Sequence, residues 1–98
     1  MTYDLTEKLR FDDDPVLVIR GVSLTVKSDA AVVLRLMDLL REQGGVTGAE
    51  AAMEMLLSPE DRKKLDDMRL KLDDYLAVFA AAVKLAMGED PEENASGE

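Results

Sequence analysis

The stretch KLDDMRLKLDDY (Lys64–Tyr75) decides how the second half of this chain folds. It lies within a long series of apolar residues at helical spacing, which one continuous helix would explain. Two features favour a break instead. The segment alternates apolar and charged residues, with Leu70 off the apolar stripe of a continuous helix, and Asp73 is suited to cap a new helix. The pattern alone leaves both interpretations open.

The same stretch repeats a Leu-Asp-Asp unit, at Leu65–Asp67 and again at Leu72–Asp74. Paired carboxylates can hold a metal ion or act as acid and base. On one helix, however, Asp66 and Asp73 would be about 10 Å apart along the axis, whereas calcium ligands lie about 2.3–2.6 Å from the ion. Nearby Lys and Arg residues also offer ordinary ion-pair partners. We therefore interpret these acids as a solvated helix face, without a metal site or a catalytic pair.

The composition removes most enzymatic chemistry. The chain has no Cys and no His, and so lacks thiol nucleophiles, thiolate or imidazole metal ligands and the usual general base near neutral pH. The glycines at 44, 45 and 48 lack the Lys and Ser/Thr of a phosphate-binding loop. We predict a protein that is not an enzyme and that takes no cofactor, metal or small-molecule substrate.

The charge and hydropathy of the chain limit its partners. The net charge is -9 with scattered Lys and Arg residues, which disfavours nucleic acid and suits a basic protein partner. No apolar run is close to the length of about 20 residues that a membrane span needs. The polar N-terminus also lacks the apolar core of a signal peptide. We expect a cytoplasmic protein without membrane contact. A chain of 98 residues forms one small domain, which self-association would help to stabilise.

The periodicity predicts an α+β fold that is mostly helical, with an N-terminal β-hairpin followed by three or four amphipathic helices. The segment VLVIRGVSLTV is rich in β-branched residues and is interrupted by Arg20-Gly21, which is typical of a hairpin. Residues 88–98 carry five acids and no base, which predicts a disordered acidic tail. Within one domain over residues 1–87, we place the hairpin at about 16–26 and helices at about 29–43, 48–57, 59–70 and 73–87.

Several helix boundaries have local signals. Ser28 or Asp29 is suited to cap the first helix, which the glycines at 44 and 45 would end. Thr47, with Glu50 three positions later, has the spacing of a capping box for the second. In SPED (residues 58–61), a serine cap, a proline at the first helical position and two acids in the first turn predict the start of the third.

The order of these features resembles the tail assembly chaperones of long-tailed bacteriophages and prophages. The likeness lies in the VIRGVSLTV hairpin, the helix start in MLLSPEDRKKL and the ending AMGEDPEE, and it spans residues 10–93. It implies a chaperone in the bacterial host cytoplasm that binds and solubilises the tape-measure protein, helps tail-tube protein assemble around it and then leaves. The chain would be the short form, without the frameshifted extension of many relatives. Relatives break the helix near the segment matching Arg69–Asp73, which favours two helices here.

Partner contacts are expected on apolar helix faces, because helices bind chaperones through helix-in-groove contacts. Core packing is the alternative role for each of these side chains. Two other functions stay open: an acidic secretion-type chaperone or adaptor for another dedicated partner, and an acidic nucleic-acid mimic or antitoxin. The mimic ranks lower because the acids are spread over the chain. The predicted contact residues are Tyr75, Leu76, Phe79, Val83 and Met87, with a second set of Leu36, Met37 and Leu40.

Overall fold

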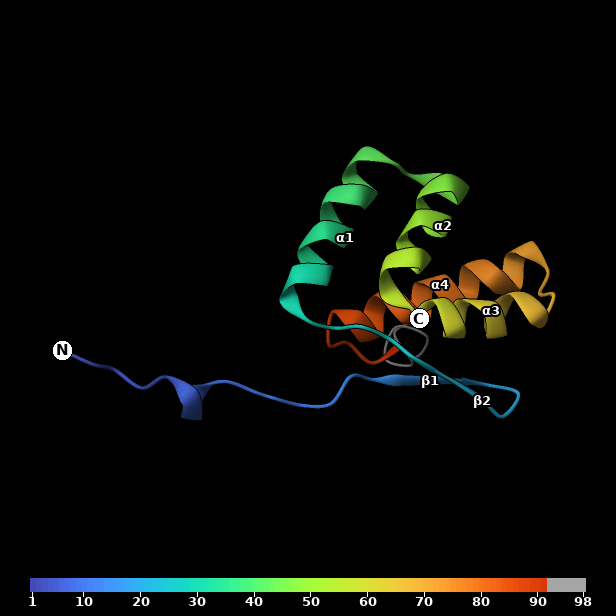
Figure 1. The fold of residues 1–98 in the computed structure, drawn as a ribbon. Helices are drawn as coiled ribbons and strands as arrows, with labels where there is room; N and C mark the ends of the chain where they lie inside the picture. The colour runs from blue at the N-terminus through green and yellow to red at the C-terminus, as the bar shows by residue number, and fades with distance from the viewer. Residues whose placement is uncertain (92–98) are drawn as a thin grey trace.

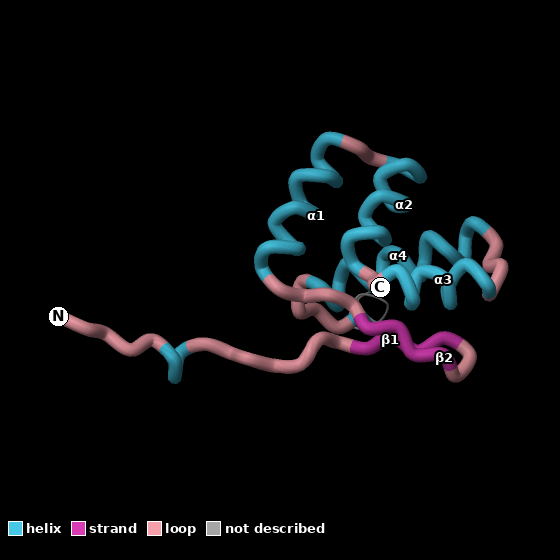
Figure 2. The backbone as a smooth tube through the Cα atoms, in the orientation of Figure 1, coloured by secondary structure: helices cyan, strands magenta, loops and turns pink. Residues whose placement is uncertain are grey.

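The fold is a two-stranded antiparallel hairpin followed by four helices, and so α+β and mostly helical, as predicted. It is seen in a computed structural model of the chain, which describes residues 1–91 (Figure 1). The hairpin lies on one side of the helices (Figure 2), and the exposed N-terminal arm, residues 1–14, extends away from them. The elements are a short 3-10 helix η1 (Thr6–Lys8), β1 (Val16–Ile19), β2 (Val22–Thr25), α1 (Ala30–Glu42), α2 (Gly45–Leu56), α3 (Pro59–Asp67) and α4 (Leu72–Ala86).

The hairpin forms because Arg20 and Gly21 make a two-residue turn. Both residues have positive φ, 51° and 81°, which the type I′ turn requires and glycine adopts at low cost. Leu17 lies opposite Leu24 in the register. Side chains alternate across the sheet, so Leu17 and the fully buried Leu24 face the helices while Val18 is exposed.

The predicted break between α3 and α4 is present. After α3 ends, Arg69 adopts a positive φ of 54°, and its N–H donates to the Asp66 carbonyl at 3.1 Å. This turn brings Leu70 against the hydrophobic core. The side chain that did not fit a continuous helix therefore packs where the two helices separate.

The predicted cap of α4 is wrong. Lys71 occupies the N-cap position and makes no side-chain capping bond, whereas Asp73 lies inside the first turn beside Asp74. The two carboxylates still stabilise the helix start, because negative charge is favourable near the positive end of the helix dipole. At the other end, Gly88 has a φ of 80°, its N–H donates to Leu85 and that of Glu89 donates to Lys84. This is a Schellman ending. Residues 92–98 of the predicted acidic tail lie outside the described residues.

The other helix starts agree with the sequence to different degrees. Ser58 caps α3 as predicted, since its Oγ accepts from the Asp61 N–H at 3.1 Å. Asp29 occupies the N-cap of α1 without a side-chain bond. The capping box predicted for α2 is absent: Gly44 is its N-cap, and Thr47 lies within the helix. The glycines thus begin α2 earlier than expected.

The core lies where β2 and the helices meet. Ala52 of α2 and Ala82 and Ala86 of α4 are buried there, and their small side chains allow the helices to approach closely. No aromatic residue is fully buried among residues 1–91, although Tyr75 and Phe79 pack against the core from its edge. The largest fully buried side chains are Leu24, Val26, Leu36, Met53, Leu56 and Leu57.

Asp61 ties α3 to the hairpin. Its Oδ2 accepts from the Thr25 N–H at 2.9 Å, across a separation of 36 residues. We expect Asp61→Ala to lower the free energy of unfolding by about 1–2 kcal/mol, because the Thr25 N–H loses its charged acceptor. Urea denaturation followed by circular dichroism measures this change. Asp67→Ala is the control, since Asp67 makes only an exposed i,i+4 ion pair with Lys63 and should cost about 0.5 kcal/mol or less. Equal losses would contradict the role of Asp61 as a tie.

Candidate partner-binding surface

A stripe of apolar side chains lies on α4 beside the face that packs into the core. Its members follow one another at intervals of three or four residues, which places them on one flank of the helix. Leu72 is 54% exposed and Met87 39% exposed. Leu76 is half-buried and is not among the described side chains that pack against the core. We call this stripe the α4 flank; it consists of Leu72, Leu76, Ala80, Val83 and Met87.

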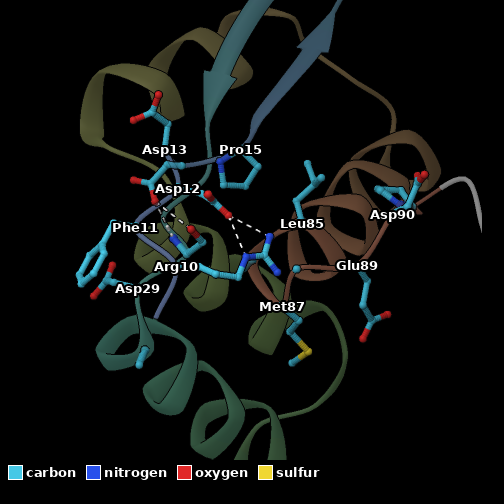
Figure 3. A pocket seen from close by; sticks show the side chains of 16 residues that line it. Arg10, Phe11, Asp12, Asp13, Pro15, Asp29, Leu85, Met87, Glu89 and Asp90 are labelled. Carbon is cyan, nitrogen blue, oxygen red and sulfur yellow. Dashed lines mark hydrogen bonds and ion pairs between the residues drawn. The ribbon is translucent and has the colours of Figure 1, made fainter. Parts of the chain in front are cut away.

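An open groove of about 850 Å³ lies at the C-terminal end of α4. It is bounded by that helix end, the start of α1 and the chain before β1 (Figure 3). Its apolar lining includes Phe11, Ala30 and Leu85, and Met87 belongs both to the groove and to the α4 flank. The two features therefore meet at Met87.

The lining of the groove is also acidic. Carboxylates from the chain before β1, the start of α1 and the end of α4 line it, whereas the described lining contains one basic residue, Arg10. That guanidinium is already paired with Asp12 at 2.8 Å (Figure 3). A lining that combines apolar side chains with carboxylates favours an apolar segment that also carries Lys or Arg. The lining acids are Asp12, Asp13, Asp14, Asp29, Glu89 and Asp90.

The structure separates the predicted contact residues of α4. Tyr75, Phe79 and Val83 are half-buried and pack against the core. Leu76 and Met87 lie on the α4 flank. Val83 belongs to the flank as well, at its border with the face that packs into the core. All five residues remain predicted contacts, but their accessibility differs. Leu72, which belongs to the same flank, was missed, although its position four residues before Leu76 was a signal for it.

The second predicted set, on α1, is divided in the same way. Leu36 is fully buried, Leu40 is half-buried against the core, and Met37 is 52% exposed. Leu34, which was not predicted, lies three residues before Met37 and is 63% exposed. Leu36 therefore belongs to the core of the folded chain, and the outward side of α1 presents Leu34 and Met37.

Two observations bear on catalysis. Burial raises the pKa of the Tyr75 phenol, and the nearby carboxylates of Asp66 and Glu50 raise it further, so this hydroxyl stays protonated at neutral pH. Residues 1–91 contain no group of three or more carboxylate, Cys or His side chains placed to hold a metal ion. Within the same range, no helix is both long enough and apolar enough to cross a membrane.

Comparisons with known proteins give no relative. No family model, no curated protein and no solved structure matches this chain.

Proposed function

We propose that this protein is a tail assembly chaperone of the long-tailed phage type, which binds and solubilises the tape-measure protein and aids assembly of the tail tube. The observation that supports this most is the α4 flank. It is an apolar stripe in which Leu72, Ala80 and Met87 are exposed, and its last member, Met87, also lines a groove of about 850 Å³. Exposed apolar surface of this kind, with polar residues around it, is typical of binding sites.

The dimensions of the α4 flank suit a helical segment. From Leu72 to Met87 the flank is about 22 Å long, which corresponds to about four turns of a partner helix. Such a helix would place its own apolar residues, three and four apart, against the stripe. The side chains of the flank are Leu, Ala, Val and Met, and Met in particular adapts to different partners. This suits a chaperone that covers many segments of a long helical protein.

The charge of the protein also suits a chaperone. The net charge of -9 would keep a complex with an apolar partner dispersed, because like-charged complexes repel one another. The acidic lining of the groove would attract basic residues that flank an apolar segment. A chaperone for a different dedicated partner would use the same surface, so the identity of the partner has to be tested directly.

Co-expression tests this function. Helical fragments of the tape-measure protein encoded downstream of this gene should be insoluble alone and soluble with the wild-type chain. We expect Leu76→Lys to remove most of this rescue and to weaken binding of a purified fragment at least about tenfold, because a charge replaces an apolar contact at the centre of the interface. Soluble yield and isothermal titration calorimetry measure the two effects.

Ala77→Lys is the matched control, because Ala77 is exposed on the same helix and lies outside the α4 flank. Ala77→Lys should unfold at the temperature of the wild type, and Leu76→Lys, which changes a half-buried side chain, should still be folded by circular dichroism at the temperature of the binding measurement. If Ala77→Lys abolishes rescue as completely as Leu76→Lys, net charge and not the flank governs binding. If the wild-type chain rescues no tape-measure fragment, the proposed function is wrong.

A further inference from the structure

The outer edge of β1 is unpaired. The Val26 N–H donates to the Pro15 carbonyl at 2.9 Å, so these residues form a hydrogen-bonded pair across the hairpin. Pairs alternate in an antiparallel ladder, and the backbone N–H and C=O groups of Val16 and Val18 therefore point away from β2. No described residue forms a hydrogen bond with these outward groups.

The opposite edge of the hairpin is treated differently. On β2, the outward N–H of Thr25 is occupied by the Asp61 carboxylate, so α3 blocks strand pairing at that position. On β1, the side chains of Val16 and Val18 are 52% and 60% exposed, and Val16–Ile19 contains no charged residue. Monomeric proteins usually protect a free edge with charges, a proline or a bulge. The β1 edge has none of these within the strand; its short length of four residues is its one protection, and its outward groups can pair with another strand.

We propose that β1 pairs with β1 of a second copy of this chain. The two strands would run antiparallel about a twofold axis at Leu17, which joins the hairpins into one four-stranded sheet in the order β2, β1, β1, β2. Val16 would then exchange backbone hydrogen bonds with the partner's Val18, and the partner's Val16 with Val18. The four valine side chains would cover one another on the face that is exposed in a single chain.

Charge complementarity favours a second copy in this register. With the axis at Leu17, Asp14 lies opposite the partner's Arg20, and the symmetry makes this contact twice. Asp14 accepts from Ser28 through Oδ1, whereas its Oδ2 and the Arg20 guanidinium have no ion-pair partner within residues 1–91. A register shift of two residues in one direction would place Arg20 opposite the partner's Val16. A shift in the other direction would place it opposite the partner's Asp12, which is already paired with Arg10. The dimer uses one short strand from each copy, so we expect it to be weak and concentration-dependent.

Analytical ultracentrifugation of the full chain tests this inference. The wild-type protein should change from monomer to dimer as its concentration rises. Val18→Pro should weaken the dimer at least about tenfold, because it removes one outward N–H from each copy. The hairpin should survive, since that N–H takes no part in it and edge strands tolerate proline. Ser23→Pro is the matched control: it makes the same change at an outward position of β2, and the dimer should form as in the wild type.

Arg20→Glu provides a second test that leaves the strand intact. It sets a negative charge opposite the partner's Asp14 and should also weaken the dimer, less so at high salt, because salt screens the repulsion. If Val18→Pro fails to fold by circular dichroism, Arg20→Glu and Val18→Lys carry the test. A wild-type chain that stays monomeric at all accessible concentrations overturns the inference. So does a dimer that none of these β1 variants weakens.

Discussion

Replacing Leu56 by alanine is expected to destabilise the protein strongly. Leu56 is fully buried at the end of α2, within the cluster that joins β2 to the helices. Its loss should reduce the free energy of unfolding by about 2–5 kcal/mol, through lost apolar burial and the cavity that remains. Domains of this size have about 5–15 kcal/mol in total, so the melting temperature should fall by at least about 10 °C.

The position of Leu56 explains why the site would not collapse around the cavity. The Leu56 carbonyl accepts from the Lys27 N–H at 2.9 Å, which fixes the end of α2 against the chain that leaves β2. Leu34→Ala is the control, because it makes the same chemical change on a side chain that is 63% exposed and should cost about 0.5 kcal/mol or less. Thermal and urea denaturation measure both. Similar losses for the two variants would be inconsistent with the core described above.

The parts of the fold that sequence predicts well are those governed by local chemistry. The Arg20-Gly21 turn is indicated by a glycine, which adopts positive φ at low cost, between two runs rich in β-branched residues. The start of α3 is equally local, because Ser58 and Pro59 act within one turn of helix. The break before α4 also had a local sign in Leu70, whose place off the stripe indicated that a continuous helix would leave it unpacked.

The features that sequence misses depend on residues far apart in the chain. In the sequence, Asp61 is an ordinary acid in the first turn of a helix. Its hydrogen bond with Thr25 depends on the fold, which brings the two residues together. The start of α2 was misplaced for a related reason. Thr47 and Glu50 have capping-box spacing, yet the turn after α1 allows helix to begin at the preceding glycines, so the local signal has no free helix end to cap.

The sequence predicts that the candidate surface lies on the last helix, but not which face of that helix is exposed. Periodicity identifies the apolar side chains of α4, whereas it cannot say which of them the rest of the protein covers. In the folded chain, Tyr75 and Phe79 turn toward the core, and Leu76 and Met87 lie on the α4 flank. The direction of α4 is set by the break that precedes it. The break thus decides which part of the apolar helix is left exposed.

Gly48 is an unusual position because of the tight turn between α1 and α2. It lies inside α2 and is buried, where a glycine normally weakens a helix relative to alanine by about 1 kcal/mol. A Cβ atom at this position would overlap the backbone carbonyl oxygen of Gln43. Gln43 is the C-cap of α1, and its N–H donates to the Leu39 carbonyl at 2.7 Å. The backbone that the Cβ would strike is therefore held in place, and the turn from α1 to α2 can close tightly only over a glycine.

Gly48→Ala should consequently destabilise the protein, against the usual helix preference. We expect a loss of about 2–3 kcal/mol in the free energy of unfolding, because relief of the overlap must move backbone between two packed helices. Urea denaturation measures it, with Thr47→Ala as the control: Thr47 is exposed in the same helix and should gain up to about 0.5 kcal/mol from the better propensity of alanine. A Gly48→Ala variant more stable than the wild type would show that the α1–α2 turn is looser than described. A loss confined to Gly48→Ala would establish that steric contact with Gln43, and not helix propensity, requires glycine at this position.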